Sequence, residues 1–123
     1  VGNYNWNPAQ YAIRIRAEVS QDAMSVSGRD DAPELQAGRQ LTTASVRWPG
    51  TGGLAWPTDQ YNSSPSLVPL FDELRAAFGD LAVGGHVQLW LDGADLFEGE
   101  VALEDFADPA NHPAQLSLNW TCP

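Results

Sequence analysis

The sequence has one cysteine, few basic residues and no long apolar run, and each shortage excludes a class of protein. Cys122 alone cannot form a disulfide within the chain, nor can it build a cysteine-rich zinc site. No apolar run approaches the roughly 20 residues that a membrane-spanning helix needs. No secretory leader is evident after Val1, and whether Val1 is the native first residue stays open.

The chain has only six basic residues, all of them arginines. Against them stand sixteen carboxylates, which gives a net charge of −10. The imbalance lies after Trp48, where Arg75 is the only base, whereas the part before Trp48 is neutral. An anionic surface repels phosphate groups, so we expect neither sequence-specific binding of DNA or RNA nor attraction to an anionic membrane. Such a surface suits a wall along which DNA slides without adhering.

The 123 residues, 43% of them hydrophobic, are enough for one domain with its own core. There is no internal repeat and no obvious linker, so we predict a single domain over residues 1–123. Within it we expect an N-terminal arm at 1–10 and a long Gly/Pro/Ser-rich loop at 51–65. Loops of this length inside a compact domain are often functional.

The chain before this loop predicts two strands. Apolar and charged residues alternate over Tyr11–Val19, which places Arg14, Arg16 and Glu18 on the outer face of a half-buried strand. A second strand, rich in Thr and Val, is predicted over Gln40–Trp48.

One amphipathic helix is predicted over Leu67–Phe78. Ser66 is the expected N-cap, and Gly79 is expected to end the helix in a left-handed conformation. The apolar positions recur at the i, i+3, i+4, i+7 spacing of a core-facing stripe, and they are Leu67, Leu70, Phe71, Leu74, Ala77 and Phe78.

The remaining chain predicts a three-stranded meander over His86–Leu91, Leu96–Phe106 and Ala114–Trp120, with a hairpin-type turn at Asp92-Gly93. Leu116, Leu118 and Trp120 are expected to face inward. The fold class is therefore α+β and mainly β: a small β-sandwich or barrel with one flanking helix.

Residues that could carry chemistry do not form a recognisable constellation, so we expect no enzyme, metal site or cofactor. His86 and His112 lack evident partners, and Cys122 lies next to the last residue. Neighbouring carboxylates on a strand point to opposite faces, so a converging pair for a hydrolase is not expected, although the number of acids leaves one formally possible.

Five tryptophans are many for this length, and one interpretation is that they pack in the core and between elements. Trp90 faces away from Leu89 and Leu91, either under the helix or at a contact between subunits, where aromatic residues are enriched. An alternative function is a carbohydrate-binding β-sandwich, in which sugars stack on Trp56, Tyr61 and Trp90.

Acidic residues gather in one stretch, since residues 92–108 contain seven carboxylates and no base. Like charges on one strand face are mildly destabilising, so this excess indicates either a solvated face or a surface that functions by being negative. The candidates for such a surface are Asp92, Asp95, Glu98, Glu100 and Glu104.

The order and spacing of these elements resembles the tail tube proteins of long-tailed bacteriophages and the related tubes of contractile injection machines. The resemblance runs from about Tyr11 to Trp120, and the chain is short for the family. The segments that carry it are Val26–Asp31, Gly38, Gln40–Trp48, Leu67–Phe78, Leu96–Val101 and the last strand.

The resemblance implies a structural virion protein, assembled in the host cytoplasm, that forms homo-oligomeric and commonly hexameric rings stacked into a tube. DNA passes through the acidic lumen without specific binding, and the other partners are tail proteins. A tail completion or terminator protein is equally compatible. The arm and the loop would make the contacts between subunits, and the aromatic candidates for these contacts are Tyr4, Trp6, Trp56, Tyr61 and Trp90.

Overall fold

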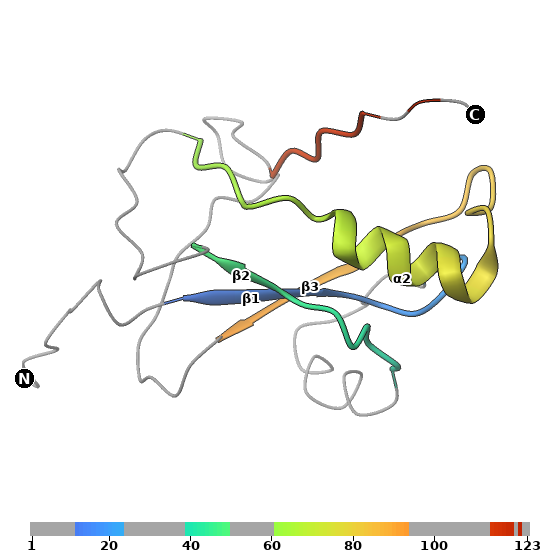
Figure 1. The fold of residues 1–123 in the computed structure, drawn as a ribbon, viewed down its shortest axis with the longest axis horizontal. Helices are drawn as coiled ribbons and strands as arrows, with labels where there is room; N and C mark the ends of the chain where they lie inside the picture. Colours follow the sequence, from blue (N-terminus) through green and yellow to red (C-terminus); the bar gives the residue numbers. More distant parts are fainter. Residues whose placement is uncertain (1–11, 24–38, 50–60, 94–113, 120, 122–123) are drawn as a thin grey trace, which may run out of the picture.

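The computed structural model describes residues 12–23, 39–49, 61–93, 114–119 and 121. They form a mixed α+β unit of three strands and one helix (Figure 1). No helix in these ranges is long and apolar enough to cross a membrane. In chain order the elements are β1 (Ile13–Ala17), β2 (Val46–Trp48), α2 (Val68–Phe78) and β3 (Leu89–Gly93).

The three strands form one open antiparallel sheet in the order β2-β1-β3. Residues of β1 pair with β2 as Ile15 with Val46, and with β3 as Ile15 with Leu91. The alternation seen in the sequence therefore places a strand in the middle of the sheet, and its odd-numbered residues all point to one face. Arg14 and Arg16 project from the opposite face of the sheet.

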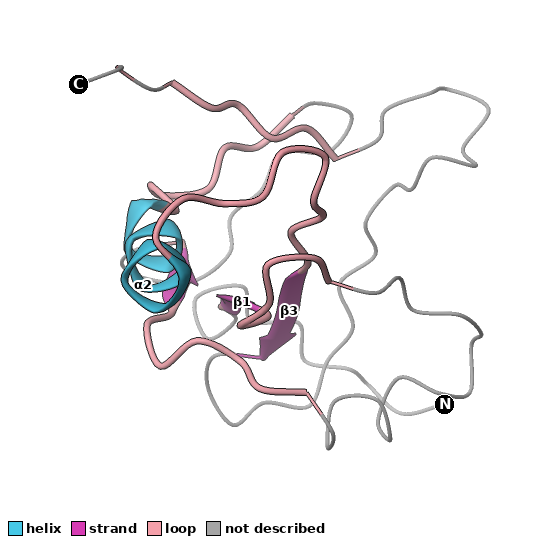
Figure 2. Ribbon diagram, turned by 90° about the vertical axis from the view of Figure 1, so that its right-hand side faces the viewer, coloured by secondary structure: helices cyan, strands magenta, loops and turns pink. Residues whose placement is uncertain are grey.

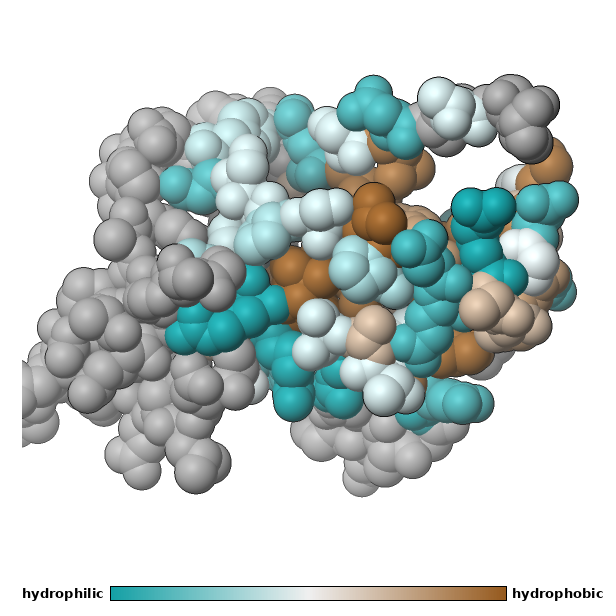
Figure 3. All heavy atoms as spheres, viewed as in Figure 1, coloured by the Kyte–Doolittle hydropathy of each residue, from teal (hydrophilic) through white to brown (hydrophobic). Residues whose placement is uncertain are grey.

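The core lies between the odd-numbered face of β1 and helix α2, which covers one side of the sheet (Figure 2). Leu70 and Leu74 are completely buried there, as the helical stripe predicts. They pack with the buried residues Ile13, Ile15, Ala17 and Val46 of the sheet. Seen from the helix side, apolar residues also reach the surface around α2 (Figure 3).

The ends of α2 agree with the prediction to within one residue. The N-cap position is Leu67 rather than Ser66, and the Ser66 hydroxyl instead accepts a hydrogen bond from the Val68 N–H at 3.3 Å. Gly79 follows the last turn with φ of 75°, a conformation that favours glycine, and its N–H donates to the Arg75 carbonyl.

The second strand is much shorter than the predicted Gln40–Trp48. Only Val46–Trp48 and an isolated bridge from Leu41 to Glu18 remain. In between, Glu73 of α2 accepts hydrogen bonds from the N–H groups of Thr43 and Ala44, both at 2.7 Å. These donors are therefore bound to the helix and not to a neighbouring strand, which explains the interruption.

We expect Glu73→Ala to lower the urea midpoint of unfolding more than Glu73→Gln, because Gln keeps one oxygen acceptor for the two N–H groups. Hydrogen exchange should show the reason directly, with the amides of Thr43 and Ala44 losing protection in the Ala variant. Unchanged protection of both amides would contradict this role of Glu73.

Of the predicted C-terminal meander, the described residues contain one strand. The third strand is shifted to Leu89–Gly93, so Asp92 and Gly93 pair with β1 as strand residues and do not form the predicted hairpin-type turn. Residues 114–119 form no strand, and Leu116 and Leu118 are half exposed rather than inward. The expectations for residues 1–10, for most of the 51–65 loop and for Leu96–Phe106 lie outside the described residues.

Candidate functional site

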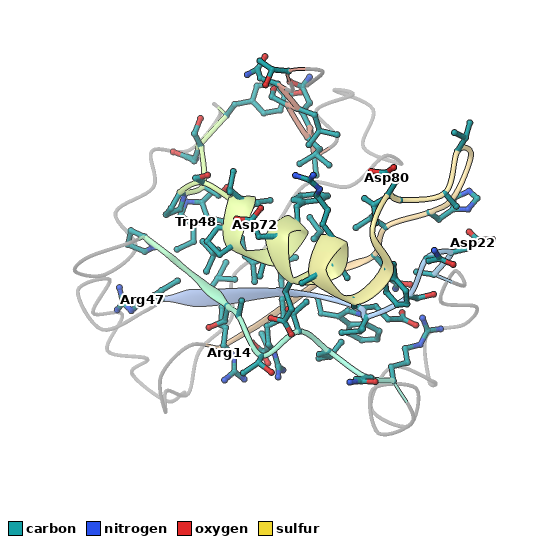
Figure 4. The ribbon with its side chains drawn as sticks, turned by 45° about the vertical axis from the view of Figure 1, so that its right-hand side comes forward. Arg14, Asp22, Arg47, Trp48, Asp72 and Asp80 are labelled. Carbon is teal, nitrogen blue, oxygen red and sulfur yellow. The ribbon has the colours of Figure 1, made fainter. Side chains whose placement is uncertain are left out.

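The face of the sheet opposite α2 is polar, and we call it the arginine face. Even-numbered residues of β1 and β3 project from it, and Figure 4 shows Arg14 on the side of the sheet away from α2. It contains four arginines but only two carboxylates among the described residues, in a chain whose net charge is −10. Its members are Arg14, Arg16, Glu18, Arg39, Arg47, Gln88, Trp90 and Asp92.

Asp92 joins β3 to β1 through two arginines. Arg14 binds both oxygens of the carboxylate, from Nε to Oδ1 at 2.9 Å and from Nη2 to Oδ2 at 2.7 Å. Arg16 adds one hydrogen bond from Nη2 to Oδ2 at 2.8 Å. The hydrogen bonds from Arg14 are the main reason why the pKa of Asp92 lies below its ordinary value. The carboxylate stays ionised and clamps the two strands together.

Trp90 lies beside a second ion pair. Arg39 binds the carboxylate of Glu18 and donates from Nη1 to the Gln88 side-chain oxygen at 3.1 Å. Its guanidinium also lies over the Trp90 ring, 5.7 Å from the centroid, which is a cation–π distance. Arg39 and Glu18 are largely buried, with side-chain exposures of 9% and 13%. Arg39 therefore connects Glu18, Gln88 and Trp90 on this half of the face.

Two donors on this face remain without an acceptor. Nε of Arg16 and Nε1 of Trp90 are both buried and make no hydrogen bond within the described part of the chain. Burying an N–H without an acceptor is costly, so buried polar groups of this kind are uncommon and call for an explanation.

The residues predicted to form an acidic wall or subunit contacts are only partly described. Asp92 is balanced by Arg14 and Arg16, so it adds little negative potential to the surface. Trp90 lies on the face away from α2, so the alternative that it packs under the helix is wrong. The remaining candidates lie outside the described residues, and they are Tyr4, Trp6, Trp56, Asp95, Glu98, Glu100 and Glu104.

Tyr61 and Trp90, which the alternative function predicts to stack on sugars, each have a contact within the chain. It is 52% exposed, and its hydroxyl accepts a hydrogen bond from the Gln115 side chain at 3.2 Å. Trp90 has the Arg39 guanidinium against its ring. A cation in this position competes with a sugar for that surface of the ring.

His86 has a partner that the sequence did not indicate. Its Nδ1 lies 2.8 Å from Oδ1 of Asp22, which also accepts a hydrogen bond from the His86 backbone N–H. These contacts lower the pKa of Asp22. Both side chains are more than two-thirds exposed. No group of three or more His, Cys, Asp or Glu residues that could hold a metal ion occurs in the described ranges.

No strand among the described residues pairs with the outer edge of β3. In the described part of the chain the sheet ends at this strand. The hydrogen bond from the Glu18 N–H to the Gln88 carbonyl continues the β1–β3 ladder, so even-numbered residues of β3 direct their main-chain groups toward β1. Those of Leu89 and Leu91 therefore point away from the sheet. The Leu91 side chain is 45% exposed at this edge.

The sequence alone does not predict the arginine face, although part of its signal is present. Alternation places Arg14, Arg16 and Glu18 on one outer face, and it separates Trp90 from Leu89 and Leu91. The sequence alone does not show that the outer face of β1 and Trp90 belong to the same surface, because nothing in it specifies that β1 and β3 are neighbours. A comparison with family models, with curated proteins and with solved structures found no match to this chain.

Proposed function

We propose that the chain is a structural subunit of the bacteriophage tail-tube type, which assembles with copies of itself into rings. The outer edge of β3, with which no strand in the described ranges pairs, is the observation that carries the proposal. Exposed strand edges invite pairing with another chain, and soluble proteins usually protect them with charges, prolines or a covering segment. At this edge the main-chain groups of Leu89 and Leu91 point outward, beside an exposed leucine side chain.

Pairing of β3 with a strand of the next copy would extend the sheet across subunits and complete a sandwich or barrel around a ring. Closed rings leave no free edge, which is why cyclic assembly suits a subunit with an open strand. The net charge of −10 on each copy supports a lumen that repels DNA phosphates. The six carboxylates of residues 95–108 would supply much of that charge.

The test is the Leu91→Pro variant. Its missing N–H faces the open edge, so the ladder to β1 keeps its hydrogen bonds while pairing with another copy is blocked. We expect the sedimentation mass of the native chain to rise with concentration, and more so at high salt, which screens repulsion between like-charged copies. In Leu91→Pro, association should weaken by at least about tenfold.

Leu91→Thr is the matched control, because it removes the apolar side chain but keeps the N–H and a good strand residue. It should retain most of the association if main-chain pairing is responsible. Far-UV circular dichroism and urea midpoints establish that both variants fold. A native chain that stays monomeric at high concentration, in both low and high salt, would contradict the proposed function.

A further inference from the structure

The two unpaired donors of the arginine face lie on neighbouring strands. Arg16 and Trp90 are directly opposite one another in the register of β1 and β3. Their side chains leave the same face, with Cβ atoms about 5 Å apart. A single acceptor group placed between them could accept from Nε of Arg16 and from Nε1 of Trp90.

The charge around these donors calls for an anion. Arg14 and Arg16 share the single carboxylate of Asp92, and Arg14 donates to both oxygens of that carboxylate. Arg16 therefore has one hydrogen bond from Nη2 and an unused Nε. The cluster also reaches the solvent, since the side chains of Arg16 and Asp92 are 22% and 28% exposed. A ligand that approaches from there reaches the two donors only after the side chains that cover them shift, because both nitrogens are buried.

We propose that Arg16 and Trp90 form a carboxylate-binding site on the arginine face. One carboxylate accepts hydrogen bonds from both donors. It also balances the one positive charge of the Arg14–Arg16 pair that Asp92 leaves over. Charge-assisted hydrogen bonds of this kind are stronger than those between neutral groups. Asp92 and Glu18 lie in the same cluster and disfavour a more highly charged phosphate. The carboxylate comes either from a second copy of this chain, which has sixteen, or from a free small molecule.

The experiment follows the indole N–H signals of the five tryptophans by 15N NMR, with Trp90 assigned from a Trp90→Phe variant. Sodium acetate is titrated against sodium chloride at equal ionic strength. We expect acetate to move the Trp90 signal saturably, with an affinity in about the millimolar range or weaker. Arg16→Lys keeps the charge but lacks Nε, and it should weaken the response by about tenfold. Arg75→Gln, at an exposed position of the helix, should leave it unchanged.

Dilution of the protein distinguishes the two sources. If a second copy supplies the carboxylate, the Trp90 signal moves with protein concentration and acetate reverses the movement. If a free carboxylate is the ligand, the signal responds to acetate alone. A Trp90 signal that responds to neither, or that responds equally in Arg16→Lys, overturns the site. The result is separate from the proposed function, because a monomer can bind acetate and an assembly can form without this site.

Discussion

Replacing Leu74 with alanine is expected to destabilise the fold by about 2–5 kcal/mol, because the substitution truncates one of the two leucines at the centre of the core. Leu74 is completely buried between α2 and the odd-numbered face of β1. Its truncation removes apolar contacts and leaves a cavity that a rigid sheet cannot close. The free energy of unfolding from urea titration followed by circular dichroism measures the change.

Val68 supplies the control for this prediction. It lies on the same helix but is 58% exposed, so Val68→Ala should change the free energy of unfolding by no more than about 0.5 kcal/mol. Similar losses in the two variants would mean that α2 does not pack on the sheet through the face containing Leu74.

Replacing Asp92 with asparagine should have the second-largest effect. The substitution leaves Arg14 and Arg16 without their shared carboxylate and directs an amide NH2 toward two cations. Hydrogen bonds to charged groups contribute about 1.5–3 kcal/mol, and the partial exposure of this cluster reduces that figure. We expect a loss of about 1–2 kcal/mol, measured by urea unfolding at neutral pH. Asp80→Asn, at an exposed position, is the matched control.

The effect of Asp92→Asn should also depend on pH in a defined direction. Because folding lowers the pKa of Asp92, its stabilising contribution is complete above the unfolded pKa and is lost as the pH falls through the folded value. The native chain and the variant should therefore differ most at neutral pH and converge toward about pH 2. A difference that stays constant down to that pH would contradict the ionic role of Asp92.

Local patterns in the sequence are sufficient to predict β1 and α2. The alternation around Ile13 and Ile15 specifies a strand with one apolar face, and the helical stripe contains the two completely buried leucines. Gly79 marks the end of the helix because few other residues adopt its φ. In each case the determining interactions lie within a few residues along the chain.

Two of the wrong predictions share a physical cause, which is contact between distant residues. Glu73 binds the N–H groups at Thr43 and Ala44, about thirty residues away, and interrupts the predicted second strand. Asp92 lies 78 residues from Arg14, and their ion pair holds Asp92-Gly93 in the sheet. Local turn chemistry alone predicts a hairpin turn for this dipeptide. Neither contact leaves a periodic signal, so the arginine face could not be assembled from the sequence.

We propose that identical copies assemble through the outer edge of β3, and electron microscopy of the concentrated protein is the test of this assembly. At high salt we expect closed rings of uniform size with a central opening, some of them stacked into tubes, and their loss in Leu91→Pro. A field of single small particles at every concentration and salt condition would contradict the claim.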